Sequence, residues 1–194
     1  MPDLTSHTIS VHSLLSQSRA NGPGRRAVVW LQGCTLNCPG CFNPETHDID
    51  GGTIMDTDDL AREIISLRHG VEGITISGGE PFLQPKALRR LLAHIRSDSS
   101  LSVLIFSGYR RKEIEEMQHG RAILSMTDIL IDGRYDTTLH LGAGLLASSN
   151  QRIHFLTDRY SPSDLEDTPP FEVLIDSAGA VTVTGINPPF ASLP

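Results

Sequence analysis

All three cysteines of this 194-residue chain lie in one short stretch, at Cys34, Cys38 and Cys41. The stretch follows an apolar run at residues 27–31 that has the composition of a buried strand. Three thiolates on one loop at a strand end are close enough together to bind a single metal centre. A structural zinc site and an ordinary iron–sulfur cluster each take four protein ligands, so a cubane cluster bound by three cysteines keeps one iron open to a substrate or cofactor.

A second group of small and polar residues stands at the ends of the strands predicted after the cysteine loop. Because ligand sites in open α/β sheets lie outside the carboxyl ends of the strands, we expect this group and the cysteines to form one rim. Glycines in the group let the backbone approach a ligand closely. Glu80 can receive an ammonium group, and Asp132 is a second candidate acceptor. The group consists of Gly78, Gly79, Glu80, Ser107, Asp132 and Asn150.

Predicted strands and helices alternate along the chain, and this alternation positions the rim. Capping residues and apolar stripes predict one helix from 56 or 57 to 70, one from Pro85 with a stripe that reaches Ile95, and one from 111 to 119 ended by Gly120. The alternation implies parallel strands with right-handed crossovers. The chain contains too few strand–helix units for a closed eight-stranded barrel. The predicted fold class is therefore α/β, a partial (β/α) barrel or an open sheet. Apolar and alternating patterns predict strands at 8–14, 27–31, 73–77, 101–106, 128–133 and 151–156.

The composition changes after about Tyr160. Residues 161–170 are rich in serine, proline and aspartate and have the character of a linker. Alternating residues at 171–175 and 181–184, around a turn at 176–179, predict a β-hairpin. We therefore divide the chain into a main α/β domain at 1–160 and a C-terminal extension at 161–194 that contains the linker and the hairpin.

Composition and charge limit the classes of protein to which the chain can belong. Hydrophobic residues make up 39% and charged residues 20%, the proportions of a globular protein. A net charge of −7 argues against binding to nucleic acid or to an anionic membrane. No apolar segment approaches the ~20 residues of a membrane span, and residues 1–7 lack the features of a secretory signal. Clustered cysteines form no disulfide framework, which indicates metal or redox chemistry in a reducing cytoplasm.

The motif Cys34-x3-Cys38-x2-Cys41, followed at the next strand end by Gly78-Gly79-Glu80, resembles the radical S-adenosylmethionine superfamily. Several stretches occur in the same order between about Ile9 and Phe155 as in its small activating enzymes, above all the anaerobic ribonucleotide reductase activases. Much of the superfamily has an aromatic residue before the last cysteine, whereas this chain and the small activases have glycine there. The stretches lie at 21–24, 30–34, 38–44, 107–109, 131–133 and 148–151.

This resemblance implies a ligand set. The three cysteines bind three irons of a [4Fe–4S] cluster, and the amino and carboxylate groups of S-adenosylmethionine chelate the fourth. Gly78, Gly79 and Glu80 line the methionine part, with Glu80 near its ammonium group. The predicted cofactor-binding set also contains Phe42, Asn43, Ser107, Asp132 and Asn150.

The resemblance also implies an activity and partners. One electron, from a reductant such as flavodoxin or ferredoxin, cleaves S-adenosylmethionine to methionine and a 5′-deoxyadenosyl radical. In the activases this radical abstracts hydrogen from a glycine Cα of a large glycyl-radical enzyme, such as the anaerobic ribonucleotide reductase. The implied fold is the partial barrel of the radical S-adenosylmethionine enzymes.

Other interpretations of the same residues stay open. His47 could complete a Cys3His zinc site. His47 or Asp48 could complete a closed cluster that serves only electron transfer. The alternative radical enzyme acts on a small molecule or peptide in a biosynthetic pathway, with the predicted hairpin helping to close the site. Arg25 and Arg26 are interpreted as solvated surface charge.

Overall fold

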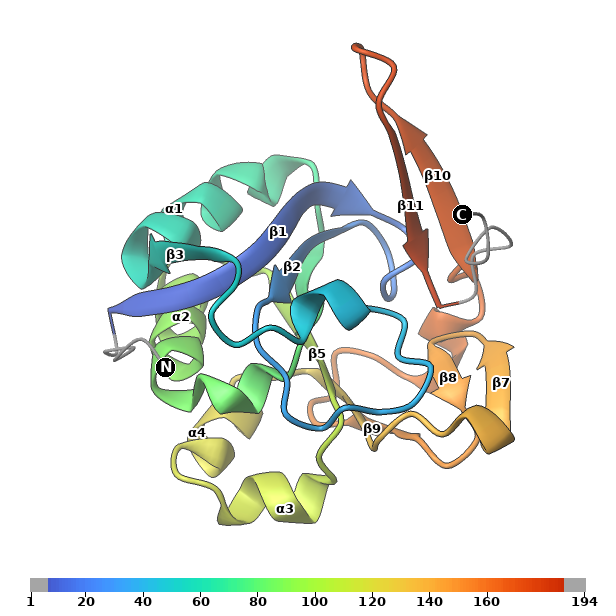
Figure 1. Cartoon of the computed structure of the whole chain (residues 1–194). Helices are drawn as coiled ribbons and strands as arrows, with labels where there is room; N and C mark the ends of the chain where they lie inside the picture. Colours follow the sequence, from blue (N-terminus) through green and yellow to red (C-terminus); the bar gives the residue numbers. More distant parts are fainter. Residues whose placement is uncertain (1–6, 187–194) are drawn as a thin grey trace.

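The computed structural model describes residues 7–186 and contains a mixed sheet of seven strands (Figure 1). Their order is β3-β1-β2-β4-β5-β6-β9. The four central strands run parallel, while β1, β3 and β9 are antiparallel to their neighbours. The strands are β1 (Thr8–Ser18), β2 (Arg26–Leu31), β3 (Thr53–Asp56), β4 (Gly73–Gly78), β5 (Ser102–Ser107), β6 (Ile129–Asp132) and β9 (Arg152–Phe155).

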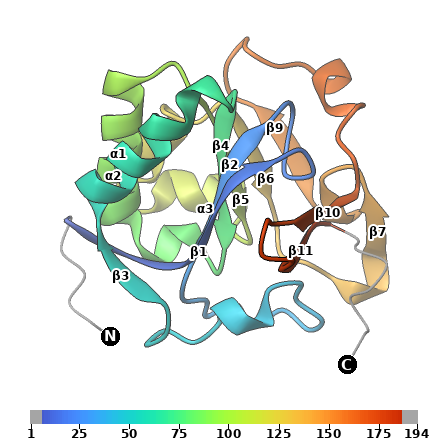
Figure 2. The ribbon, with the colours of Figure 1, turned by 90° about the horizontal axis from the view of Figure 1, so that it is seen from above.

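Four helices connect strands of this sheet and lie together on one of its faces (Figure 2). The first begins as predicted, because the Asp56 side chain accepts hydrogen bonds from two backbone N–H groups of its first turn. Pro85 starts the second, also as predicted. None of the helices within residues 7–186 is long and apolar enough to cross a membrane. The helices are α1 (Thr57–Ser66), α2 (Pro85–Asp98), α3 (Arg111–Glu116) and α4 (Gly120–Leu124).

The two faces of the sheet pack into separate apolar cores. Alternate residues of a strand point to opposite faces, so Val103 and Ile105 of β5 join the core beneath the helices, while Leu104 joins the other. In the same way Leu130 of β6 faces the helices, and its two neighbours face away. Burial on both faces explains the apolar runs of β2, β5 and β6, whereas β4 alternates isoleucine with the small polar residues Thr75 and Ser77.

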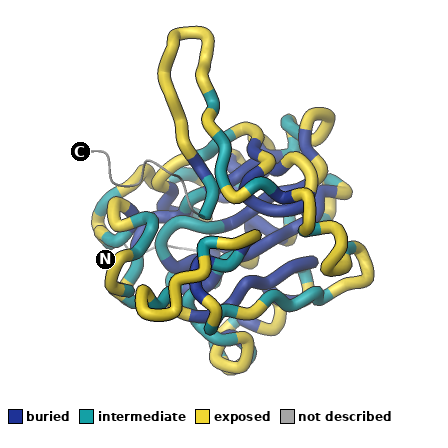
Figure 3. The backbone as a smooth tube through the Cα atoms, turned by 90° about the vertical axis from the view of Figure 1, so that its right-hand side faces the viewer, coloured by how far each residue is buried: buried dark blue, intermediate teal, exposed yellow. Residues whose placement is uncertain are grey.

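Two hairpins lie on the side of the sheet away from the helices. The predicted C-terminal hairpin is confirmed, and it projects from the body with most of its length exposed (Figure 3). A second, shorter hairpin follows β6. The hairpin strands are β7 (His140–Ala143), β8 (Leu146–Ser148), β10 (Phe171–Ile175) and β11 (Val181–Gly185); the 3-10 turns are η1 (Pro44–Thr46), η2 (Leu67–His69), η3 (Pro81–Leu83), η4 (Thr137–Leu139) and η5 (Pro162–Leu165).

The expectation of parallel strands throughout was wrong for β1 and β9. β1 joins β2 through a short turn, and a short connection between neighbouring strands permits only an antiparallel pair. β9 follows β6 without an intervening α-helix and pairs with it antiparallel. The observed architecture is therefore a mixed α/β fold with β3 and β9 at the edges of the sheet.

The third predicted helix, over 111–119, is shorter than predicted, and a separate short helix follows it. α3 ends at Glu116, and His119 adopts a left-handed conformation with φ of 68°. Gly120 does not end a helix but begins α4, where a Cβ atom would overlap the carbonyl oxygen of Ile114. The glycine is thus required for close packing between two short helices.

Arg26 is not the surface charge that the sequence indicated, although Arg25 is exposed as expected. The Arg26 side chain is fully buried at the start of β2 and donates hydrogen bonds to Thr75 Oγ1 at 2.8 Å and Ser102 Oγ at 2.9 Å. Burial lowers its pKa, and these bonds replace the water that it loses. Arg26 therefore joins β2, β4 and β5 at the ends opposite to the cysteine loop.

Candidate metal and cofactor site

The cysteine loop leaves the end of β2 and is closed by its own backbone. Gly33 N donates to the Thr46 carbonyl at 2.8 Å, and Cys34 N donates to the His47 carbonyl at 3.2 Å. Thr46 is buried, and its Oγ1 donates to the Asn43 carbonyl at 2.7 Å. These bonds fix the two ends of the loop and leave the segment between them free to present its side chains.

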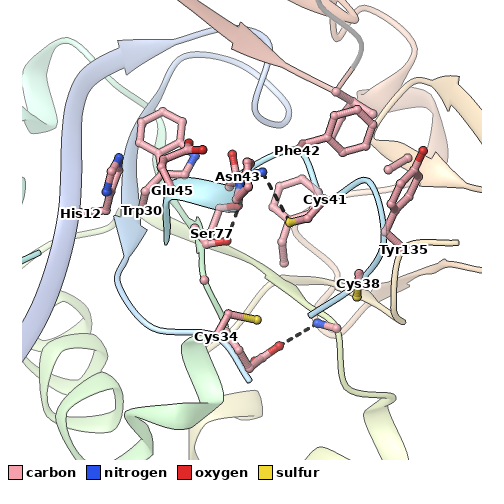
Figure 4. Close-up of a pocket in the computed structure, with 18 of the residues that line it drawn as sticks. His12, Trp30, Cys34, Cys38, Cys41, Phe42, Asn43, Glu45, Ser77 and Tyr135 are labelled. Atoms are coloured by element: carbon pink, nitrogen blue, oxygen red, sulfur yellow. Dashed lines mark hydrogen bonds between the residues drawn. The ribbon is translucent and has the colours of Figure 1, made fainter. Parts of the chain in front are cut away.

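The three cysteines line one cavity of about 780 Å³ (Figure 4). All are free thiols and partly buried. Burial raises the pKa of the Cys34 and Cys41 thiols. Asn43 N lies 3.5 Å from the Cys41 sulfur and donates to it. A cavity of this size is in the range of sites that enclose a cofactor.

Gly78 and Gly79 bring the end of β4 against the end of β2 and line the same cavity. Gly79 N donates to the Leu31 carbonyl at 2.8 Å. A Cβ atom at Gly78 would overlap the backbone of Leu31, and one at Gly79 would overlap the carbonyl of Gly33. Glycine is therefore required at positions 78 and 79 because the two strand ends touch there, and this holds for any ligand in the cavity.

Glu80 is 1% exposed and its carboxylate is held by three donors. Oε1 accepts from Phe82 N and from Ser107 Oγ, both at 2.9 Å, and Oε2 accepts from Gly108 N at 2.8 Å. Burial raises the pKa of Glu80 to about 7, although these hydrogen bonds oppose the shift. Glu80 thus links the ends of β4 and β5 at the wall of the cavity.

Phe42 belongs to an aromatic group at one side of the cavity. Its ring centroid lies 4.9 Å from that of Tyr135, whose hydroxyl is 3.1 Å from His140 Nδ1. Gly40 has φ of 70°, and a Cβ atom there would lie 2.7 Å from Thr137 Cγ2. The left-handed backbone and the methyl group of Thr137 both favour glycine at position 40, whereas Tyr135 would be in ordinary contact with a side chain there.

Asp132 and Asn150 are the two predicted site residues that the structure does not bring to the cavity. Asp132 Oδ2 accepts from Arg111 N at 2.7 Å and lies 3.0 Å from His154 Nε2. Asn150 Nδ2 donates to the Arg134 carbonyl at 2.9 Å. The residues that follow each of them do line the cavity, and a role for Asp132 and Asn150 in binding a cofactor stays a prediction.

The other predicted site residues lie together at the cavity. Phe42, Asn43 and Ser107 line the cavity together with the three cysteines and the Gly78–Glu80 segment. Asn43 Nδ2 is 3.5 Å from the Gly78 carbonyl and joins the cysteine loop to β4.

Several residues at this cavity were not found from the sequence. Trp30 is the one partly exposed residue of β2, and His12, Trp30 and Glu45 lie on the side of the cavity away from Phe42 and Tyr135 (Figure 4). Gln151 Nε2 donates to the Gly133 carbonyl at 2.9 Å. A partly exposed tryptophan in a buried strand cannot be recognised in the sequence, because exposure depends on what packs against the strand. Residues 182–186 of the C-terminal hairpin also line the cavity.

Residues 20–154 match the family described as the 4Fe-4S single cluster domain. The match contains the three cysteines and the strands from β2 to β8. The chain belongs to this family. Membership of the 4Fe-4S single cluster domain family favours an iron–sulfur cluster over zinc at the cysteine loop.

The residues of the site fit a single [4Fe–4S] cluster, as the description of the family implies. Cluster cysteines bind different irons, so their sulfurs need not converge on one point, whereas the ligands of one zinc ion must. Within residues 7–186, no three histidine, cysteine or acidic side chains are gathered as ligands of one ion. His47, the fourth ligand of the zinc interpretation, lines the cavity, and its Nε2 is buried without a hydrogen-bond partner.

The chain is similar to activating proteins from several bacteria. A pyruvate formate-lyase-activating enzyme of Clostridium pasteurianum is 32% identical over 125 residues, which are 62% of this chain and 50% of the relative. An anaerobic ribonucleoside-triphosphate reductase-activating protein of Haemophilus influenzae is 32% identical over 59% of this chain and 77% of its own length. The protein of the same name from Escherichia coli is 28% identical over 76% of this chain and 99% of its own.

Proposed function

We propose that the chain is a radical S-adenosylmethionine oxidoreductase that activates a glycyl-radical enzyme. Cys34, Cys38 and Cys41 would bind three irons of a [4Fe–4S] cluster, with S-adenosylmethionine on the fourth. Reduction of the cluster by one electron would lead to cleavage of the bound S-adenosylmethionine, which would supply a 5′-deoxyadenosyl radical. The observation that carries this proposal is that three free thiols and the segment Gly78–Glu80 line one cavity.

Glu80 is the residue proposed to bind the ammonium group of S-adenosylmethionine. Oε1 accepts two hydrogen bonds, whereas Oε2 accepts only the one from Gly108. Because a carboxylate oxygen has two lone pairs, Oε2 keeps one acceptor position. The three protein donors hold the carboxylate in a fixed orientation, which reduces the entropy that binding must offset.

The other residues of the predicted set fall into two roles. Phe42, Asn43 and Ser107 would contact the cofactor, because they line the cavity. Asp132 and Asn150 are proposed to position it indirectly, through the adjoining residues that line the cavity.

A partner protein is proposed as the substrate. The activating proteins that resemble this chain are named for glycyl-radical enzymes, a pyruvate formate-lyase and an anaerobic ribonucleoside-triphosphate reductase. The alignment with the Escherichia coli reductase-activating protein covers 99% of that relative, which favours the reductase as the partner. The cavity would receive a loop of the partner that carries the glycine, and a flavodoxin or ferredoxin would supply the electron.

The proposed domain organisation follows the extent of the family match. Residues 1–160 would form the radical S-adenosylmethionine domain, of which 1–6 lie outside the described residues, and its sheet is proposed to be a partial (β/α) barrel. Residues 161–194 would form the C-terminal extension, of which 187–194 lie outside the described residues. In support, the family match ends at 154, before η5 and the hairpin.

The test of this function is the formation of a glycyl radical. The protein is loaded with iron and sulfide without oxygen, reduced, and mixed with S-adenosylmethionine and the anaerobic ribonucleoside-triphosphate reductase of the same organism. Electron paramagnetic resonance should detect a glycyl radical on the reductase. Consumption of S-adenosylmethionine with a radical on neither this reductase nor pyruvate formate-lyase would reject the activase and favour a small-molecule or peptide substrate.

A further inference from the structure

One face of the β10–β11 hairpin consists of exposed aliphatic side chains. Val173 is paired with Val183, and Ile175 with Val181, so the four side chains lie on one face of the two strands. These side chains, which we call the aliphatic face, are between 39% and 70% exposed. Four neighbouring β-branched residues in water form a small apolar patch, which marks an interaction site only where it is part of a larger surface.

The opposite face of the hairpin fixes its position on the body. Thr184 is buried, and its Oγ1 accepts a hydrogen bond of 2.9 Å from Asn21 Nδ2. Glu172, which is paired with Thr184, accepts from Arg19 N at 3.0 and 3.2 Å through its two oxygens. The hairpin is thus bound to the turn between β1 and β2 (Figure 1). Because successive residues of a strand point to opposite faces, the aliphatic face is on the other side of the hairpin from Glu172 and Thr184.

The aliphatic face is continuous with the cavity that contains the cysteines. Val183 belongs to both, and residues 182–186 form part of the cavity lining. Asn21, the residue that anchors the hairpin, lines the cavity as well. A protein segment that enters the cavity on this side therefore meets the hairpin.

We infer that the aliphatic face docks the glycyl-radical enzyme whose glycine loop enters the cavity. This inference rests on the proposed function. The hairpin lies beyond residues 20–154, the part matched by the family, so the docking surface is a feature that this chain adds to the shared domain.

The size of the aliphatic face favours this occupant over a second copy of the chain. Four aliphatic side chains expose only a few hundred Å², whereas a stable interface buries ~800 Å² on each partner. The face alone is too small for a stable dimer. Joined to the cavity mouth, it becomes one part of a composite interface that a large partner can cover.

The decisive variant is Ile175→Thr/Val181→Thr. Neither residue lines the cavity, and threonine keeps the β-branched shape while adding a hydroxyl that resists burial. Ile54→Thr is the matched control, because Ile54 is an isoleucine, 49% exposed, on the edge strand β3. Glycyl-radical formation is measured against the concentration of the anaerobic ribonucleoside-triphosphate reductase of the same organism, and 5′-deoxyadenosine is measured without the reductase.

The double variant should raise the half-saturating reductase concentration about tenfold, while Ile54→Thr leaves it unchanged. Cluster content and reductase-independent 5′-deoxyadenosine should stay at the wild-type level in both. An unchanged half-saturating concentration in the double variant, with a normal radical yield, would overturn the docking inference and leave the activase intact. Absence of a radical with the wild-type chain would reject the activase and the docking inference together.

Two other occupants give different results. If a second copy covers the aliphatic face, sedimentation will show a wild-type dimer that the double variant dissociates without a change in the half-saturating concentration. If residues 187–194 cover it, a chain that ends at Ile186 will bind the reductase more tightly than the full chain. Either result overturns the inference.

Discussion

The Glu80 carboxylate and the Gly108 backbone N–H form a hydrogen bond of 2.8 Å between the loops that follow β4 and β5. Ser107 and Phe82 donate to the same carboxylate, so one buried side chain organises both loops. Replacement of the Glu80 side chain should therefore affect the wall of the cavity, while the backbone bond of 2.9 Å from Glu80 N to the Gly33 carbonyl, at the start of the cysteine loop, is kept.

Glu80→Ala should keep the cluster and weaken the binding of S-adenosylmethionine. A hydrogen bond to a charged group contributes about 1.5–3 kcal/mol, which predicts a rise in Kd of roughly tenfold to a hundredfold. Equilibrium binding of S-adenosylmethionine to the loaded protein measures this change. Glu63→Ala, an exposed glutamate of α1, is the control and should bind normally. A normal Kd in Glu80→Ala would remove Glu80 from the proposed site.

The pH dependence of stability should reflect the raised pKa of Glu80. The pKa is about 7 in the folded chain, against the ordinary value of 4.5. Between these values the folded state holds the proton that the unfolded state releases, so the free energy of unfolding falls as pH rises, by about 3 kcal/mol in total. Urea unfolding at several pH values should show this fall in the wild type and a smaller one in Glu80→Gln. Parallel pH profiles of the two proteins would contradict the assignment.

Cys38→Ala should lose the cluster, as should the corresponding changes at Cys34 and Cys41. Each cysteine would bind a different iron, so no remaining ligand can replace the missing thiolate. Iron and sulfide content after reconstitution measures the loss. His47→Ala is the informative control, because it should keep a full cluster unless His47 is a ligand. A full cluster in Cys38→Ala would contradict the ligand set.

Gly40→Ala should destabilise the cysteine loop. The backbone has φ of 70°, and the new Cβ atom would lie 2.7 Å from Thr137 Cγ2. We expect a loss of about 1–3 kcal/mol in the free energy of unfolding. Thr137→Ser removes the opposing methyl group, so the double variant should recover part of this loss. Equal stabilities of Gly40→Ala and the wild type in urea unfolding would show that the loop adapts.

The sequence predicted the parts of the fold that depend on local patterns. The strands β2, β5 and β6 are apolar runs, and β4 alternates isoleucine with small polar residues. The Asp56 cap and Pro85 mark the starts of α1 and α2. The edge strand β3 and the antiparallel β9 were not predicted, because each pairs with a strand distant in sequence. The direction of β1 was missed although the turn at 21–24, which permits only an antiparallel pair with β2, can be recognised in the sequence. Gly120 was misread since its reason, contact with the Ile114 carbonyl, is tertiary.

The candidate site shows the same division. The cysteine motif and Gly78–Glu80 carry their own signals in the chain, and the structure places them at one cavity. Tyr135 carries no such signal, since only the folded sheet brings it there. Trp30 and Gln151 lie in stretches that resemble the small activases, but nothing in those stretches assigned the two side chains to the site. The buried position of Arg26 was missed for a related reason, as its hydrogen-bond partners lie on β4 and β5.

The most direct test of the account is the quantity of 5′-deoxyadenosine formed by the anaerobically reconstituted and reduced protein with S-adenosylmethionine. The account predicts formation that requires the reductant and is abolished by alanine at Cys34, Cys38 or Cys41. A loaded cluster that cleaves no S-adenosylmethionine, even with glycyl-radical enzymes present, would indicate electron transfer instead. A protein that retains zinc and takes up no iron would contradict the radical chemistry altogether.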